Sequence, residues 1–128
     1  MGKRIDREGP IHRACIEYLE TALPGAVVFH PSNELPLKGK QVARAIAKAK
    51  WNGTTPGYPD IICHWQGMTM LFEVKAEGNY LSTAQRDMRD RLEGQAIPYA
   101  VVRSVDDLQE ALADFEHMAA VPLRGVVS

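Results

Sequence analysis

The chain has 128 residues, 45% of them hydrophobic, which fits one globular domain with its own core. Because 15 Lys and Arg face 16 Asp and Glu, the formal charge is −1 and a bulk polybasic protein is excluded. No apolar run approaches the roughly 18 residues of a membrane span, and the N-terminus lacks a signal-peptide core, so we expect a cytoplasmic protein with no membrane partner.

Hydrophobic periodicity predicts helices over about 10–23 and 40–50, with a short strand at 26–30 between them. Two strands at 60–65 and 68–75 follow, joined by Gln66-Gly67, and a capping box at Ser82 opens a helix that ends at Gly94. A strand at 97–103 and a helix from Ser104 come last, and the tail after about His117 carries little signal. The order α-β-α-β-β-α-β-α predicts an α/β domain with a mixed sheet flanked by helices.

The turn at Gln66-Gly67 fixes the register of the predicted hairpin. It puts Trp65 opposite Met68, so all apolar residues of one face align, and it sets Asp60 opposite Glu73 with Cβ atoms about 5 Å apart. Two facing carboxylates repel each other. The pattern allows two interpretations: a solvated charged strand face, with Glu73 paired to Lys75, or two acids that share a divalent cation. Hard oxygen ligands without Cys or His nearby in sequence favour Mg²⁺ or Mn²⁺ over zinc.

The residues Pro59-Asp60 and Glu73-Val74-Lys75 resemble the signature of PD-(D/E)XK nucleases. With their surroundings, the chain looks like the VRR-NUC family from about Glu8 to Leu112; the surrounding segments are Gly57–Ile62, Leu71–Lys75, Leu81–Gln85 and Tyr99–Ser104. In the naming motif, Ser104 follows Arg103 where the family has a second arginine. That departure weakens a two-arginine contact and leaves the acidic motif untouched.

The resemblance implies a restriction-endonuclease-like core in a single domain spanning 1–128, with a short C-terminal tail. It implies that Asp60, Glu73 and the main-chain carbonyl of Val74 bind the metal, and that Lys75 orients or deprotonates the attacking water. Glu8, in the first helix, is the candidate for a further metal-binding or catalytic acid. Gln85 matches a family glutamine. Stand-alone members are similar to Holliday junction resolvases, which implies a homodimer on branched DNA and a bacterial or phage-encoded protein.

Each of the two additional candidates also has an ordinary structural explanation. Glu8 could be a first-turn acid that complements the helix dipole, and Gln85 could serve the capping box alone.

A basic segment precedes the acidic motif. From Leu35 to Pro59 there is no Asp or Glu, yet five cations occur, three of them on one predicted helix face. Such a face is either an ordinary solvated surface or a phosphate-binding one. With Arg103 added from the family motif, the candidate DNA contacts are Lys38, Lys40, Arg44, Lys48, Lys50 and Arg103.

The sequence thus predicts a metal-dependent endodeoxyribonuclease. Two alternatives stay open: a non-catalytic DNA-binding module and a phosphodiesterase that acts on RNA.

Overall fold

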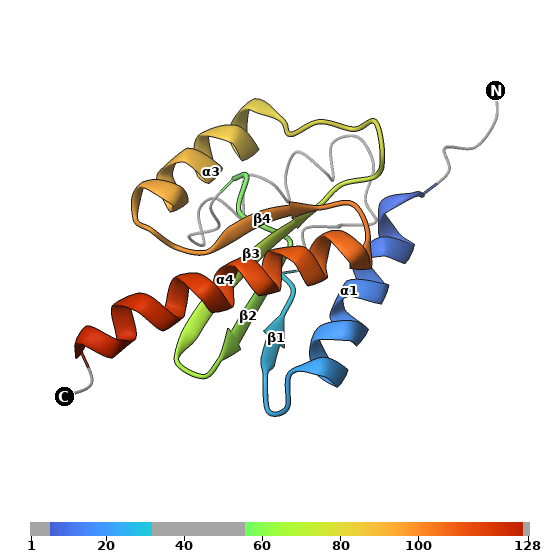
Figure 1. The fold of residues 1–128 in the computed structure, drawn as a ribbon. Helices are drawn as coiled ribbons and strands as arrows, with labels where there is room; N and C mark the ends of the chain where they lie inside the picture. Colours follow the sequence, from blue (N-terminus) through green and yellow to red (C-terminus); the bar gives the residue numbers. More distant parts are fainter. Residues whose placement is uncertain (1–5, 32–55, 127–128) are drawn as a thin grey trace, which may run out of the picture.

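The computed structural model describes residues 6–31 and 56–126 (Figure 1). The first part holds one helix and one strand, and the second part holds three strands and two helices. In chain order the elements are α1 (Glu8–Ala22), β1 (Val27–Phe29), β2 (Ile61–Trp65), β3 (Met68–Val74), α3 (Thr83–Gly94), β4 (Tyr99–Val102) and α4 (Val105–Val126). The predicted helix at 40–50 lies outside the described residues.

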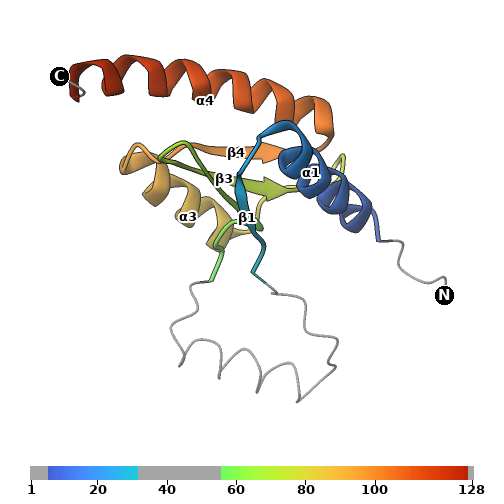
Figure 2. The same ribbon diagram turned by 90° about the horizontal axis from the view of Figure 1, so that it is seen from below.

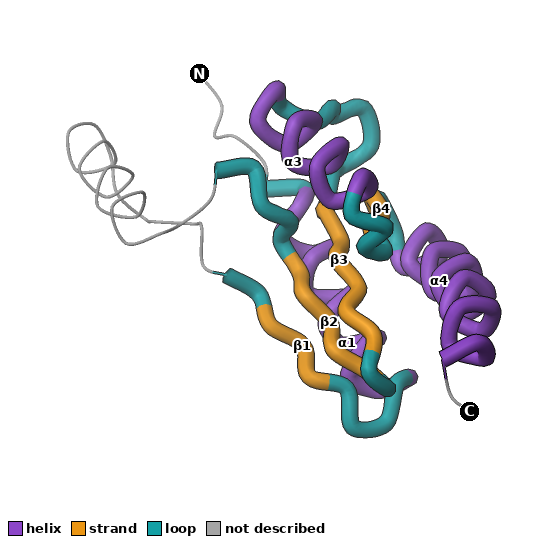
Figure 3. Tube along the Cα trace, turned by 90° about the vertical axis from the view of Figure 1, so that its left-hand side faces the viewer, coloured by secondary structure: helices purple, strands orange, loops and turns teal. Residues whose placement is uncertain are grey.

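The four described strands form one mixed sheet in the order β1-β2-β3-β4 (Figure 3). β1, β2 and β3 are antiparallel neighbours, whereas β4 runs parallel to β3, with α3 as the crossover between them. The β2–β3 register pairs Trp65 with Met68 and Ile61 with Phe72, which confirms the predicted hairpin. The turn has the left-handed backbone that a two-residue connection needs, at Gln66 (φ 50°) and Gly67 (φ 77°).

One face of the sheet packs against α1 and α4, whose buried side chains share one core with it, and α4 lies above the strands in Figure 2. Alternate residues of β2 and β3 point to this face, as their period of two requires, and all but Trp65 and Met68 beside the turn are buried. The helices add buried side chains at helical spacing, so the main core comprises, among others, Cys15, Leu19, Ile61, Cys63, Phe72, Val102, Leu108 and Phe115. Both cysteines are free and buried, and burial raises the pKa of each thiol to about 11.

The other face of the sheet is also covered, by α3 (Figure 2). Leu71 on β3 packs with Met88 and Leu92 of α3, and Tyr99 and Ile62 join from the flanking strands. Interpreting this face as a solvated strand surface is therefore wrong for β3, because the helix removes water from it. Glu73, two residues after Leu71, is carried into the same buried layer with an exposed fraction of 1%.

The last helix is longer than predicted. α4 continues to Val126, so the segment after His117, whose sequence carries little signal, extends the helix. None of the described helices is both long and apolar enough to cross a membrane.

Candidate functional site

The predicted acids meet at the end of the β2–β3 hairpin that lies away from its turn. Asp60 stands directly before β2, and Glu73 is the penultimate residue of β3. Asp60 Oδ2 accepts a hydrogen bond from the Val74 backbone N–H at 2.9 Å, so the side chain continues the strand pairing where the backbone ladder stops. This contact holds the Asp60 carboxylate against β3 next to Glu73.

Glu73 is the buried acid of this pair. Its Oε2 accepts a hydrogen bond from Gln85 Nε2 at 3.2 Å, while Oε1 is buried without a hydrogen-bond donor among the described residues. Burial in the α3-covered layer, and then the neighbouring Asp60 carboxyl, raise the pKa of Glu73 to about 10, with Lys75 acting in the opposite direction. An anionic Glu73 is therefore costly unless a cation accompanies it.

Gln85 takes part in the capping box and also contacts Glu73. Its Oε1 accepts from the Ser82 N–H at 2.8 Å, and Ser82 Oγ accepts from the Gln85 N–H at 3.1 Å, which completes the capping box of α3. The other end of the same amide donates to Glu73. Forming the helix cap thus aims the Gln85 amide at the buried carboxylate.

Glu8 opens α1 and faces the end of β3. Its Oε2 accepts hydrogen bonds from the Ala76 N–H at 3.3 Å and from Asn79 Nδ2 at 3.1 Å. Glu8, Asp60 and Val74 line one cavity of about 580 Å³, and Glu73 is not among its lining residues. Glu8 does lie in the first turn of α1, but its side chain accepts hydrogen bonds from residues 68 and 71 positions later in the chain and lines this cavity.

The carboxylate oxygens of this site suit a magnesium-sized ion that takes only part of its ligands from the protein. Within residues 6–31 and 56–126, no cluster of three or more His, Cys, Asp and Glu is close enough to hold a metal by itself. Mg²⁺ commonly takes one or two carboxylates and completes its shell with water and substrate phosphate. The buried Oε1 of Glu73 without a donor, the adjacent Asp60 carboxylate and the cavity beside them match that ligand chemistry.

The remaining predicted residues fall in different places. Lys75 directly follows β3, where its N–H donates to Val102 O at 3.0 Å, and its charge lowers the pKa of Glu73. Arg103 donates from Nη2 to Asn79 O at 2.7 Å, so one of its nitrogens is held within the fold. The basic segment lies outside the described residues: Lys38, Lys40, Arg44, Lys48 and Lys50.

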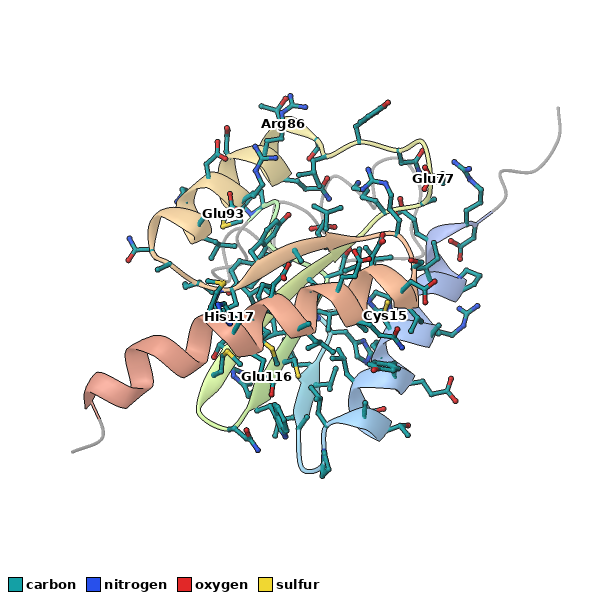
Figure 4. All side chains as sticks on the ribbon, viewed as in Figure 1. Cys15, Glu77, Arg86, Glu93, Glu116 and His117 are labelled. Atoms are coloured by element: carbon teal, nitrogen blue, oxygen red, sulfur yellow. The ribbon has the colours of Figure 1, made fainter. Side chains whose placement is uncertain are left out.

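Four further residues complete the surroundings of the site. His12 and His30 also line the cavity and meet edge to face, with ring centroids 5.7 Å apart. Asn79, in the β3–α3 loop, donates to Glu8. In the same loop Glu77 lies beside the start of α1 (Figure 4), where its carbonyl accepts from Arg7 at 3.2 Å. The Glu77–Arg7 and Asn79–Glu8 hydrogen bonds join residues 70 and 71 positions apart, and no periodicity in the sequence indicates them.

Gly57 brings the segment before Asp60 against the start of α3. It has φ +78°, and a Cβ at this position would collide with the backbone carbonyl of Ala84 and approach Gln85 N to 2.9 Å. Only glycine allows this approach, since backbone rather than a flexible side chain stands in the way. The same close contact brings the segment that leads to Asp60 against the turn that carries Gln85.

Gly57→Ala is therefore expected to destabilise the fold by about 2–5 kcal/mol, the sum of left-handed strain and overpacking. Gly67→Ala is the matched control, because Gly67 has a similar φ of +77° but nothing within 4 Å of the added Cβ. It is expected to cost about 1–2 kcal/mol from strain alone. Urea unfolding of both variants measures the difference, and equal losses would contradict the close-contact argument.

A family model described as "VRR-NUC domain" matches residues 8–106, most of the chain and all of the candidate site. The solved structure of a "VRR_NUC domain protein" has the same fold, with a TM-score of 0.64 at 18% identity, over 88% of this chain and 89% of the other. No curated protein matches. The strand–turn–strand acids, the capped glutamine and the extent of the family match together establish that this chain belongs to the VRR-NUC family, whose domain is nuclease-like.

Proposed function

We propose that this protein is a Mg²⁺- or Mn²⁺-dependent endodeoxyribonuclease that hydrolyses phosphodiester bonds in structured or branched DNA. Asp60, Glu73 and the Val74 carbonyl would hold the ion, with Glu8 beside them. A bound divalent ion supplies charge neutralisation at the phosphate and a more acidic water. The surrounding residues bind and orient the substrate.

The observation that carries the proposal is the buried Glu73 carboxyl group. It is 1% exposed, one oxygen has no donor among the described residues, and its neighbour is a second acid. Burying a carboxylate beside another costs several kcal/mol unless charge of the opposite sign compensates it. A structural role at this position would be served better by an apolar side chain. The arrangement is explained by a cation that binds there when the protein works.

Lys75 and Gln85 both interact with Glu73, one by charge and one by a hydrogen bond. Lys75 follows Glu73 by two residues and interacts electrostatically with it, so the ammonium group is placed to orient a water or to stabilise negative charge on the phosphate. The other role that the family implies for Lys75 is to accept a proton from that water. Gln85 keeps Glu73 in one orientation through its Nε2 donor.

The DNA part of the proposal comes from the family and from the charge pattern. The chain's net charge of −1 gives no general affinity for nucleic acid, so phosphate contacts must be local. The candidates remain the segment from Lys38 to Lys50 and Arg103, and nothing in their pattern is typical of a base-reading module. A preference for DNA structure over sequence follows, and a symmetric dimer would allow two strands to be cut.

The test is a cleavage assay with purified protein on four-way junctions, flaps, linear duplex and RNA, each with EDTA, Mg²⁺ or Mn²⁺. Metal-dependent cleavage that favours branched DNA supports the proposal. DNA binding with no cleavage under any of the three conditions indicates a non-catalytic DNA-binding module. Cleavage of RNA alone indicates a phosphodiesterase that acts on RNA. Sedimentation of the protein with and without a junction measures the expected dimer.

A further inference from the structure

Asn79 makes contacts with three separate parts of the fold. Its Nδ2 donates to Glu8 Oε2 at 3.1 Å, its Oδ1 accepts from Arg7 Nη2 at 3.3 Å, and its backbone oxygen accepts from Arg103 Nη2 at 2.7 Å. Its N–H closes a turn on Ala76 O at 3.1 Å. Every hydrogen-bonding group of this residue is therefore used, although it lies in a loop.

We propose that Asn79 is a positioning residue that holds the Glu8 carboxylate in place for metal binding at the cavity. The inference rests on the proposed function and deepens it, because it assigns a task to a loop residue outside the acidic motif. Both donors to Glu8, from Asn79 and from the Ala76 N–H, bind the same oxygen, Oε2. Oε1 has no hydrogen bond within the described part of the chain and stays available on a residue that lines the cavity.

The Arg7 contact sets the direction of the Asn79 amide. A guanidinium group has donors alone, so the amide atom facing Arg7 must be the oxygen, and the NH₂ group is turned toward Glu8. The same guanidinium group also donates from Nη1 to the Glu77 carbonyl at 3.2 Å. Arg7 and Glu8 are adjacent at the start of α1, so one turn of the chain supplies both the group that orients Asn79 and the carboxylate that Asn79 holds.

Arg103 fixes the backbone on which Asn79 is carried. The Arg103 N–H donates to Asp107 Oδ2 at 2.9 Å, which anchors this residue at the β4–α4 junction, and its guanidinium group reaches the Asn79 carbonyl. One arginine thus ties the loop to the β4–α4 junction, and another ties it to the start of α1. Mutating a residue that holds a metal ligand in place by a hydrogen bond typically lowers metal affinity or activity 10- to 100-fold.

The test measures Mn²⁺ affinity of the full chain by titration calorimetry without DNA, at a temperature where every variant is folded. Asn79→Ala removes the donor to Glu8 and is expected to weaken Mn²⁺ binding about 10- to 100-fold. Tyr80→Ala is the matched control, because it truncates the next side chain of the same loop, which is 81% exposed. Its Mn²⁺ affinity is expected to equal that of the parent protein.

A second variant keeps the loop attached. Asn79→Asp retains the oxygen that accepts from Arg7 but replaces the donor by an acceptor that repels Glu8, so affinity should fall here too. A tighter Mn²⁺ complex in Asn79→Asp would overturn the proposal, since residue 79 would then be acting by its own charge.

A double-mutant cycle with Glu8→Gln separates positioning from plain stabilisation. If Asn79 acts through Glu8, Glu8→Gln weakens Mn²⁺ binding and adding Asn79→Ala causes no further loss. The proposal would be overturned if the two substitutions lowered Mn²⁺ affinity independently, so that the double variant lost the product of both factors. It would also be overturned if Asn79→Ala lowered the melting temperature but left Mn²⁺ affinity equal to that of the parent. A parent protein that neither binds Mn²⁺ nor cleaves DNA would refute the proposed function itself, whereas normal binding by Asn79→Ala refutes the positioning role alone.

Discussion

Glu73→Gln is expected to lower DNA cleavage by at least about 1,000-fold while leaving DNA binding within about twofold of the parent. The amide has nearly the same shape and still reaches Gln85, but it lacks the negative charge that a divalent ion requires. The measurement pairs single-turnover cleavage of a junction at saturating Mg²⁺ with a binding titration in EDTA.

The matched control for this substitution is Glu116→Gln, the same chemical change on the exposed surface of α4 (Figure 4). Cleavage by this control should be unchanged. If Glu73→Gln cut DNA at the rate of the parent protein, the buried acid would have no part in the chemistry, and the assignment of the site to the β2–β3 hairpin would be wrong.

The metal-free protein is expected to lose stability as the pH rises, and Glu73 is the cause. The folded-state pKa of Glu73 is about 10 against an ordinary value of 4.5, so between these values the folded protein keeps a proton that the unfolded chain releases. Unfolding then becomes easier with pH, by at most about 1.4 kcal/mol per pH unit from this one group. Urea unfolding in EDTA at pH 6 and pH 8 measures an expected loss of up to about 3 kcal/mol.

Two further measurements isolate this effect. Glu73→Gln removes the titrating group, so its pH dependence over the same range should be flatter and its stability at pH 8 higher than that of the parent. Mg²⁺ or Mn²⁺ should restore stability to the parent protein at pH 8 but not to the variant, because ligands stabilise the state that binds them. A parent protein whose stability rises between pH 6 and pH 8 in EDTA would contradict the burial argument.

The hairpin could be predicted because the residues that determine it are neighbours in the sequence. A two-residue turn and the alternation around it fix the register, and the register alone places Asp60 beside Glu73. The capping box was equally local, since Ser82 and Gln85 are three residues apart. The family signature added Lys75, Glu8 and Gln85, and the structure brings Glu8 and Gln85 to the same end of the hairpin.

The burial of Glu73 was not predictable in this way. The residues around it alternate as they would on a solvated face, and only the packing of α3 on Leu71 shows that water is excluded. Asn79 and Gly57 were missed for a related reason. Their roles depend on backbone and side chains brought from α1 and α3, and a turn-forming residue in a loop gives the same local pattern whether or not it touches a site.

The amide of Gln85 also restricts how this protein could be redesigned. Position 85 needs an acceptor that reaches the Ser82 N–H and a donor that reaches Glu73, carried by one side chain of fixed length. Glutamate offers the first without the second, and asparagine is one methylene shorter. Engineering that replaces the opening turn of α3 for thermal tolerance would therefore alter the acidic pocket too, unless glutamine is kept there.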